Sequence, residues 1–599
     1  MIEDVYEPLE RYSREFRQAF AENTSLFFAN LIQKSGIDVP ANQKLCEKIH
    51  GLERDKVAGE SKRSWLFAAN FIAWFLCLAS GGLSVYLLFF VDKAEQGENH
   101  GTLVAICLGV FAITLPLIFF KLNPALKAAD AHVKKLEEEI AKLKEIAWKQ
   151  MEPLNALYDW DITTSLMEKT VPRIAFDSFF NVGRLRELQG EFGLNDRFND
   201  DKSVLFSQSG EINGNPFVLA DLLKMEWGEE TYTGTLEISW TEYERDAEGK
   251  MRRVTKHETL HASVTKPKPF FNKESCLIYG NEAAPKLEFS RKPTGLADSD
   301  GGFLQGLKKK YELGKLKKFS RNLDDDSNYT MMSNEEFELL FHSTDRNDEV
   351  QFRLLFTPLA QRQMIALLKD KKEGYGDDFQ FYKDKLINIV FPRHLDSMSL
   401  NTNPAIFCDW DLEHARVNFQ QFNENYFRAV YFTFAPLLSI PLYQQTRTRR
   451  TIYGEPLDAK ACFWEHEALA NFHGEEKFQH PNCITHNILK TDVLNEHNGI
   501  SEVKVTAYGF RGIKHIEYVS KLGGEGKFHD VPVEWTEYLP VENAGVMVVS
   551  EQPKEITRDD YNRSISDASA WREQLRELGC PDDQWASFRR DIVSFVKGV

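Results

Sequence analysis

Cysteine is scarce in this chain and is not arranged for disulfide chemistry. The 599 residues contain 8 cysteines, of which Cys77 and Cys107 fall inside apolar runs, and no two cysteines form a Cys-x-x-Cys pair. A small secreted protein held together by disulfides has a dense, regularly spaced set of cysteines. The cysteine pattern therefore excludes a disulfide framework and favours a reducing compartment.

Positive charge is also in short supply. The sequence has 73 Lys+Arg against 90 Asp+Glu, a formal net charge of −17 at pH 7. A protein that binds nucleic acid shows a basic face, so we expect no nucleic acid among the partners. In so acidic a chain, a local cluster of lysines is more informative than the total charge.

The short motifs of common enzyme families are missing. Gly523–Lys527 (GGEGK) has neither the spacing of a phosphate-binding loop nor its following Ser or Thr. No GxGxxG follows a predicted strand, and there is no GxSxG elbow or kinase set. The sequence therefore predicts no catalytic and no cofactor-binding residues, and it favours a protein that is not an enzyme.

Two long stretches lack charge altogether. Trp65–Val91 and Thr102–Phe120 contain no Asp, Glu, Lys or Arg. A helix needs about 20 apolar residues to cross a bilayer, and in hydrocarbon a helix satisfies its own backbone hydrogen bonds. The sequence therefore predicts a two-helix transmembrane hairpin.

The charges flanking these runs predict their orientation. The connection Asp92–Gly101 carries acidic residues and a single Lys93, whereas both outer flanks are basic. Excess Lys and Arg marks the cytoplasmic side of a membrane. The basic flanking residues are Arg54, Lys56, Lys62, Arg63, Lys121, Lys127, Lys134 and Lys135. We therefore expect a multi-pass protein with both termini in the cytoplasm.

The rest of the pattern predicts an α+β fold in five segments. These are an N-terminal helical segment over 1–64 with a turn at 36–40, the hairpin over 65–121, a charged helical stalk over 122–172, an α+β cytoplasmic domain over 173–450, and a C-terminal β-rich domain with terminal helices over 451–599. Apolar residues at helical spacing and alternating residues in strands carry this division.

Individual elements follow from the same two periodicities. Strands are expected at 231–244, 254–264, 276–279, 351–356 and 385–390 and throughout 484–550; helices are expected at 335–340, 358–369, 559–578 and 582–596. The aromatic run 426–443 contains Arg428, Pro436 and Pro441. It is interpreted as buried strand and helix rather than a third membrane span.

The stalk has a seam of apolar residues with alternating gaps of three and four. Its members are Val133, Leu136, Ile140, Leu143 and Ala147. Such a seam is typical of a coiled coil that joins copies of a chain, but it extends over only about two heptads. An equally good interpretation is one helix packed antiparallel to the N-terminal helices.

One region resembles a known family. Met332–Lys369 (MSNEEFELLFHSTDRNDEVQFRLLFTPLAQRQMIALLK) contains Glu-Phe-Glu at 336–338, Phe341, an acidic turn and Leu355–Pro358 followed by a helix. With the strand pattern of 379–391, the looser pattern of 214–240 and the paired spans, it resembles the bacterial membrane-protein family known as domain-of-unknown-function family 3137. The resemblance covers mainly 176–445. It implies a bacterial inner-membrane protein with a cytoplasmic domain and no established activity.

A group of Cys and His residues lies between 462 and 486. His466, His473, His480 and Cys483 are natural zinc ligands, and four such groups can close a tetrahedral site. Their spacing matches no standard zinc pattern, and His466-Glu467 lacks the second His of HExxH because residue 470 is Ala. The alternatives are a polar connector without metal and a zinc site, which would make the chain a membrane-tethered zinc hydrolase.

A basic stretch over 308–321 (KKKYELGKLKKFSR) stands out in this acidic chain. Clusters of lysine near a membrane bind anionic headgroups at about 1 kcal/mol per residue. The alternative is a solvated linker helix. The candidate lipid contacts are Lys308, Lys309, Lys310, Lys315, Lys317 and Lys318.

Two smaller features are expected to be structural. Asp409, Asp411 and Glu413 alternate, which predicts one face of a solvated strand edge rather than a cation site. Arg447, Arg449 and Arg450 are expected as an exposed turn. The sequence thus favours a membrane-anchored cytoplasmic docking or sensing protein. Its expected partners are the lipid bilayer, a second copy of itself and another membrane protein.

Overall fold

A computed structural model describes residues 7–89, 100–245, 250–297, 303–321, 329–448, 450, 452, 457–458, 460–497, 499–551, 585–589 and 592–597. The chain divides into two compact units. Unit 1 comprises Met1–Thr24, Asp159–Asn403 and Phe422–Val599, and unit 2 comprises Ser25–Tyr158 and Pro404–Gln421. The fold is a mixture of helices and antiparallel sheets with two long apolar helices, which confirms the predicted α+β class.

Unit 2 is helical. Its main helices are α3 (Val39–Phe89), α4 (His100–Leu117) and α5 (Asn123–Asn155), and a π-helical turn at Ile118–Leu122 joins α4 to α5. The predicted break at 36–40 is confirmed, because α2 (Arg17–Ser35) ends before it and Asp38 accepts a hydrogen bond from the Ala41 amide at the start of α3.

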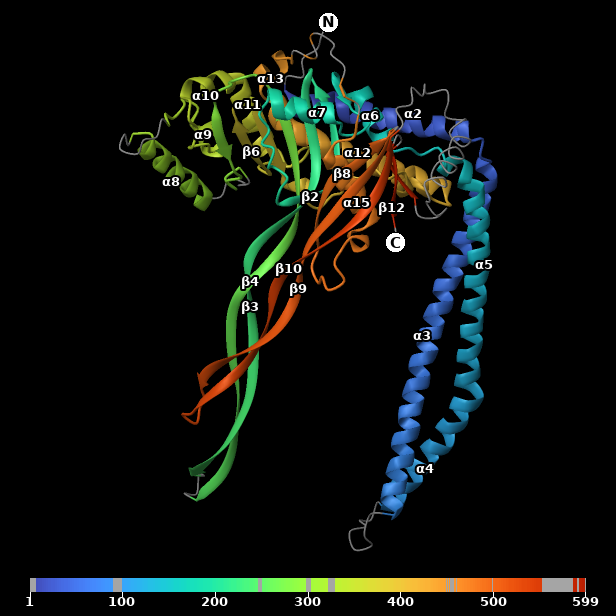
Figure 1. Ribbon diagram of the computed structural model, residues 1–599. Helices are drawn as coiled ribbons and strands as arrows, with labels where there is room; N and C mark the ends of the chain where they lie inside the picture. Colours follow the sequence, from blue (N-terminus) through green and yellow to red (C-terminus); the bar gives the residue numbers. More distant parts are fainter. Residues whose placement is uncertain are drawn as a thin grey trace. The chain divides into compact units, whose positions relative to one another are not determined.

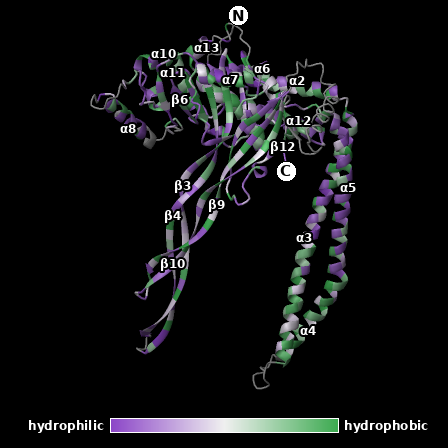
Figure 2. Cartoon of the chain, viewed as in Figure 1, coloured by the Kyte–Doolittle hydropathy of each residue, from purple (hydrophilic) through white to green (hydrophobic). Residues whose placement is uncertain are grey.

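The two apolar runs lie on α3 and α4, which pack against each other over a narrow contact. Ala73, Cys77 and Ile118 form the buried centre of that contact. Among the residues that the structure describes, two helices are long and apolar enough to cross a membrane, Val39–Phe89 and the continuous helical stretch Gly101–Asn155. Figure 2 shows hydrophobic residues concentrated on α4 and the adjoining half of α3. Of the predicted connection between them, residues 92–99 lie outside the described structure.

The stalk helix α5 packs along the first half of α3. Ile49 of α3 and Ile140 and Ala147 of α5 are buried together, so the apolar seam of α5 contacts another helix of the same chain. Ion pairs flank the contact: Lys56 lies 2.9 Å from Glu137, and Lys144 lies 2.7 Å from Glu53. Of the two interpretations of the seam, the structure has the helix packed on the N-terminal helices.

Unit 1 contains two antiparallel sheets. The strand order is β1-β2-β3-β4-β7-β6-β5 in the first and β11-β12-β10-β9-β8 in the second. The strands of the first sheet are β1 (Ile174–Phe176), β2 (Lys202–Ile212), β3 (Asn215–Arg245), β4 (Met251–Gly280), β5 (Glu288–Arg291), β6 (Phe379–Asp384) and β7 (Ile387–Pro392). Those of the second are β8 (Ile488–His497), β9 (Ile500–Leu522), β10 (Phe528–Glu551), β11 (Trp585–Arg589) and β12 (Ile592–Lys597).

Two hairpins extend far beyond the sheets as long ribbons. β3 and β4 pair along nearly their whole length, from Phe217↔Tyr279 to Arg245↔Met251. β9 and β10 pair from Ile500↔Ser550 to Leu522↔Phe528. The ribbons project from the rest of unit 1 and twist together (Figure 1), and they share a small core of Leu260, Ala262, Val531 and Val533. The predicted strands at 231–244, 254–264 and 276–279 are confirmed as parts of this much longer hairpin.

The remaining helices belong to unit 1, except that α12 begins in unit 2 and continues into unit 1. They are α1 (Pro8–Arg11), α6 (Ile162–Thr170), α7 (Val182–Arg186), α8 (Phe303–Phe319), α9 (Glu335–Phe341), α10 (Glu349–Leu355), α11 (Pro358–Lys369), α12 (Leu412–Leu438), α13 (Pro441–Gln445) and α15 (Phe463–His473). Aromatic side chains pack between them. Phe20 of α2 stacks on Phe427 of α12, with ring centroids 4.1 Å apart. The helices predicted at 335–340 and 358–369 are confirmed as α9 and α11.

Three predicted elements differ from the structure. Residues 351–355 belong to helix α10, which Phe356 ends, rather than to a strand, because Phe352 and Phe356 pack one turn apart against a cluster that includes Phe289 and Phe341. The run 426–443 contains no strand: it is helical in α12 and α13, which are separated by Ser439 and Ile440.

The third difference is at the C-terminus, where 582–596 was expected to be helical. β12 instead pairs with β10 from Val546↔Lys597 to Glu551↔Ile592, and β11 pairs with β12. The apolar residues Ile592, Val593, Phe595 and Val596 are buried there, on both faces of the strand. The helix predicted at 559–578 lies outside the described residues.

Candidate functional site

Two of the candidate zinc ligands lie on α15 and are buried. His466 is 3 % exposed, and Oε1 of Glu551 lies 3.8 Å from its Nε2. His473 Nε2 lies 2.7 Å from Ser594 Oγ on β12, and burial lowers the pKa of this imidazole to about 4. A histidine with so low a pKa is neutral at pH 7 and bonds to a hydroxyl.

The other two candidates lie beyond the helix. His480 Nδ1 accepts a hydrogen bond from the Asn482 amide, and the Cys483 thiol donates to Asn487 Oδ1 at 3.4 Å. In the described part of the chain, no three His, Cys, Asp or Glu residues are gathered closely enough to hold a metal ion. The structure therefore places His466 and His473 on one helix but does not unite the four ligands, and the zinc site stays a prediction.

The acidic residues of α15 join it to the sheets. Glu467 is buried and accepts hydrogen bonds from Asn199 Nδ2 at 2.8 Å, the Val204 amide at 3.2 Å and Lys490 Nζ at 3.1 Å. Burial raises the pKa of Glu467 to about 7 and lowers the pKa of Lys490. Glu465 Oε2 accepts from Ser207 Oγ on β2 at 3.1 Å. Both carboxylates accept hydrogen bonds, which explains how a helix with two acidic side chains is buried.

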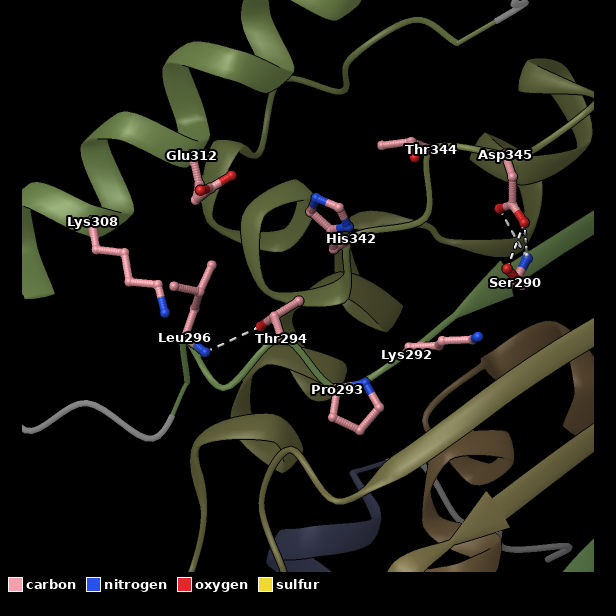
Figure 3. A pocket seen from close by; sticks show the side chains of 10 residues that line it. All are labelled: Ser290, Lys292, Pro293, Thr294, Leu296, Lys308, Glu312, His342, Thr344 and Asp345. Carbon is pink, nitrogen blue, oxygen red and sulfur yellow. Dashed lines mark hydrogen bonds between the residues drawn. The ribbon is translucent and has the colours of Figure 1, made fainter. Parts of the chain in front are cut away.

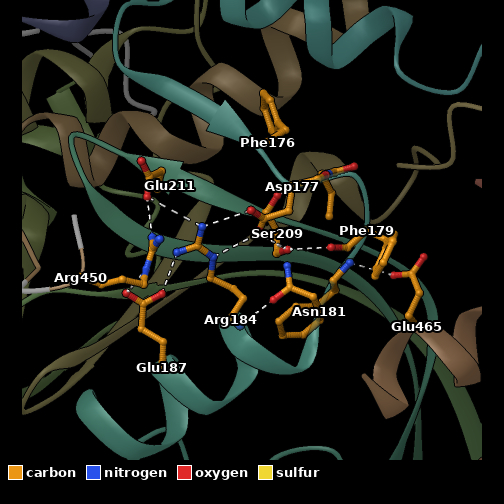
Figure 4. Close-up of polar contacts among 12 residues, drawn as sticks. Phe176, Asp177, Phe179, Asn181, Arg184, Glu187, Ser209, Glu211, Arg450 and Glu465 are labelled. Carbon is orange, nitrogen blue, oxygen red and sulfur yellow. Dashed lines mark hydrogen bonds and ion pairs between the residues drawn. The ribbon is translucent and has the colours of Figure 1, made fainter. Parts of the chain in front are cut away.

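A second buried polar cluster surrounds Arg184 (Figure 4). The Arg184 guanidinium is held by Asp177 at 3.0 Å and Glu187 at 2.7 Å. Arg450 donates to the other oxygen of Glu187 at 3.0 Å and to Glu211 at 2.6 Å. The sequence predicts Arg450 in an exposed turn. In the structure Arg450 instead joins the chain after α13 to Glu187, which directly follows α7, and to Glu211 on β2. Of its neighbours, Arg447 is exposed and Arg449 lies outside the described residues.

The acidic triplet at 409–413 is a helix cap. Asp411 Oδ1 accepts from the amides of Glu413 and His414 at the start of α12, and its other oxygen lies 2.7 Å from His50 Nε2. Asp411 thus satisfies free N–H groups at a helix N-terminus, which is the usual use of Asp at that position. The strand face predicted from their alternation is therefore wrong.

The basic stretch forms helix α8. Leu316 is buried on its inner side, whereas Tyr311 is exposed. Some of its charge is paired: Lys317 lies 2.6 Å from Glu335, and Lys315 lies 3.1 Å from Glu312. Lys308, Lys309, Lys310 and Lys318 have no ion pair with a described residue. The stretch is thus a helix with one packed side and a surplus of free ammonium groups.

A cavity of about 490 Å³ lies beside this helix. Figure 3 shows Lys308 and Glu312 extending from α8 toward the space that His342 and Thr294 line. The turn at Thr294 is fixed because its amide and that of Gly295 donate to Asp377 Oδ2, at 2.8 and 3.1 Å. Asp377 is in turn paired with the buried Arg291.

The chemistry of the cavity is mixed. Lys292 and Lys308 line it without an ion pair in the described part of the chain, and Glu312 and Asp345 provide opposite charge. Asp345 is already engaged by the amide and hydroxyl of Ser290. Of the predicted lipid-contact lysines, only Lys308 lines the cavity. The lining residues at 290–296 and 342–345 were not predicted from the sequence as part of a site, because only the fold brings them beside α8.

Comparison with known proteins gives no relative. No family model, curated protein or solved structure matches this chain. The resemblance based on residues 332–369 thus stays a prediction, and the function has to be argued from the geometry alone.

Proposed function

We propose that this chain is a membrane-anchored docking protein without catalytic activity. In this proposal α3 and α4 cross the inner membrane of a bacterium as a hairpin, and both units carry their soluble parts in the cytoplasm. The resemblance to family 3137 and the basic residues flanking the apolar runs support that placement. Confinement near the membrane raises the effective concentration of a docking module toward partners there.

The observation that carries the proposal is the exposure of large apolar side chains on α3 and α4. Phe71, Phe75, Ile106 and Ile113 are 63–71 % exposed. Only 22 % and 17 % of the most apolar windows are buried within the chain. Soluble proteins rarely leave apolar surfaces of that extent in water, whereas in hydrocarbon such side chains are well solvated.

Fractionation and protease protection test the anchor. The full chain should stay in the membrane pellet after alkaline carbonate washing. Protease added to sealed right-side-out cells should leave both units intact, and opening the cells should expose them to digestion. Release into the carbonate supernatant would disprove the membrane span. Digestion of the units by protease added from outside would show that they lie on the other side of the membrane.

The free lysines of α8 are the proposed contact with anionic headgroups. In vesicles, the full chain with Lys308, Lys309 and Lys310 changed to Gln should show faster hydrogen exchange in α8 than the unchanged chain, and only when anionic lipid is present. Changing Lys371 and Lys372, which lie outside α8, to Gln is the matched control. Equal exchange in neutral and anionic vesicles would remove α8 from the proposal. A mass measurement of the detergent-extracted protein tests the proposed self-association.

A further inference from the structure

The ribbon of β3 and β4 has two chemically different faces. From residue 231 to 243 and from 253 to 265, exposure alternates: even-numbered residues face the other ribbon and odd-numbered residues face solvent, and beyond these ranges the even-numbered Glu244 and Arg252 are exposed as well. We call the odd-numbered residues the outer face. The inner face holds Leu236, Ile238 and Leu260, which pack against β9 and β10.

The outer face is poor in acid. It consists mainly of Thr, Ser and His, and its basic residues are Arg245 and Arg253 near the tip. Glu237 is its one acidic residue among those described. The acids at the tip, Glu242 and Glu244, are on the inner face, where both pair with Lys256, Glu242 at 2.6 Å and Glu244 at 2.8 Å. Basic residues lie on both faces, since Arg252 is paired with Glu244 on the inner face, but the described acids of this part of the hairpin are, apart from Glu237, on the inner face.

At the tip, apolar and basic side chains alternate on the outer face. Tyr243 is paired with Arg253 across the strands, and Arg245 with Met251. Tyr243 is 66 % exposed and Met251 is 61 % exposed. Neither arginine forms an ion pair within the described part of the chain. Two exposed apolar groups between two free guanidinium groups are suited to a surface with anionic heads and an apolar interior.

The ribbon is held in shape behind this tip. Gly234 packs so closely on β10 that a Cβ there would lie 2.0 Å from the Pro532 carbonyl oxygen. Lys266 of β4 lies 2.5 Å from Glu517 of β9. The Gly524 amide of the second hairpin donates to Glu258 at 2.7 Å. These contacts hold the hairpin against the second ribbon as far as Glu258, and the paired strands continue beyond it to Arg245 and Met251.

We propose that the tip of β3 and β4 binds an anionic lipid surface. Tyr243 and Met251 enter the headgroup region, and Arg245 and Arg253 pair with lipid phosphates. Water remains in that region, so the open strand edges keep their hydrogen-bond partners. This contact goes beyond the anchor proposed above: α3 and α4 hold the chain in a bilayer permanently, whereas the tip makes a reversible, charge-dependent contact.

A second copy of the chain fits this face less well. In a symmetric dimer the same face meets itself, which places arginines against arginines. A stable protein interface also buries about 800 Å² on each partner, more than two exposed side chains supply. A lipid surface needs neither self-complementarity nor a large fixed area.

Photocrosslinking tests the contact in the full chain. The Tyr243→benzoylphenylalanine variant is reconstituted into vesicles of phosphatidylcholine alone or mixed with phosphatidylglycerol. After irradiation, mass spectrometry identifies what is attached. We expect a lipid adduct that requires phosphatidylglycerol. Trp240→benzoylphenylalanine on the inner face is the control and should give no such adduct.

Charge reversal provides the second arm. Arg245→Glu with Arg253→Glu should reduce the lipid adduct at position 243 by about tenfold or more, because each basic residue near an anionic surface contributes about one kcal/mol. Lys521→Glu with Lys527→Glu, the same charge change at the tip of the other ribbon, should leave the adduct unchanged. An adduct to a second protein copy, no adduct, or an adduct indifferent to charge would each overturn the proposal. Carbonate washing of the same vesicles reports the α3–α4 anchor separately, so either idea can fail alone.

Discussion

The helical hairpin of α3 and α4 and the ribbon of β3 and β4 are both long antiparallel pairs with many exposed side chains, but they expose opposite chemistry. The helices present Phe, Leu, Ile and Trp. The outer face of the ribbon presents Thr, Ser, His and Arg. The helices consist of residues that favour helix and the ribbon of residues that favour strand, so secondary-structure propensity does not explain why their exposed side chains differ in polarity.

The difference follows from where each pair satisfies its backbone. A helix makes its hydrogen bonds within itself and tolerates a solvent without donors or acceptors. The ribbon has open edges: β2 pairs with β3 only as far as Lys224, and β7 pairs with β4 only from Leu277 to Gly280. Open edges need water or another strand, and polar side chains keep them in water. The helical pair therefore suits lipid, and the ribbon suits water with contact only at its tip.

An arginine in each pair gives the largest expected contrast. Ile113→Arg, on the exposed side of α4, should lower the carbonate-resistant fraction sharply, since an arginine at the centre of a membrane helix costs about 2.5–3.5 kcal/mol. Thr235→Arg on the outer face of the ribbon should leave that fraction unchanged. Equal behaviour of the two variants would contradict the assignment of different solvents.

Truncating the thin core between the ribbons should destabilise the ribbon locally. Leu260 is buried there among few neighbours. Leu260→Ala should cost about 2–5 kcal/mol, visible as faster hydrogen exchange of β3 and β4 amides. Thr259→Ala, on the outer face next to it, should change stability by less than about 0.5 kcal/mol. No difference between these variants would mean that the ribbons do not rely on one another.

A methyl group at the closest approach of the ribbons gives a smaller effect. Gly234→Ala places a Cβ against the Pro532 carbonyl, a backbone atom that cannot turn aside. We expect a loss of about 1–3 kcal/mol, measured by hydrogen exchange of the Val531 and Val533 amides. Thr233→Ala is the neighbouring control. Unchanged exchange in Gly234→Ala would contradict the close packing.

The stability of the region where α15 packs on β12 should fall in acid, because His473 is buried there. His473 has a pKa lowered to about 4 by burial, so between about pH 4 and 6.5 the unfolded chain binds a proton that the folded chain does not. Stability therefore falls as pH drops from 6.5 toward 4, by about 1–2 kcal/mol at pH 5 from this group. His473→Gln should flatten that part of the thermal-unfolding profile against pH. An equally steep profile would assign it to other groups.

Local periodicity predicted much of the fold. The helix at 358–369 is present with the same bounds, and the alternation at 231–244 and 254–264 is present in β3 and β4. Residues 351–356 were mispredicted because Phe352, Leu355 and Phe356 also fit a short strand, and only the surrounding phenylalanine cluster selects the helix. The alternation at Asp409–Glu413 was ambiguous in the same way, since a helix cap uses the same residues.

The candidate sites were less accessible. The candidate zinc ligands at 462–486 are close in sequence, yet His466 and His473 are buried on α15. His480 and Cys483 follow the helix and bond to residues near them in the chain. The cavity beside α8 joins residues 290–296, 308–312 and 342–345, and the ribbon tip joins residues on two strands whose register only the hairpin sets. Neither pattern exists before the chain has folded.

The sequence by itself determined the two apolar helices, the basic helix and the β-rich character of the remainder, because solvent preference and hydrophobic period are properties of consecutive residues. Only the tertiary structure decided which histidines are buried, that Arg450 is held between two carboxylates, and that Glu242 and Glu244 of the long hairpin lie on the other face from Arg245 and Arg253. Those outcomes depend on strand register and on contacts between residues far apart in the chain, and neither is fixed by any local stretch of sequence.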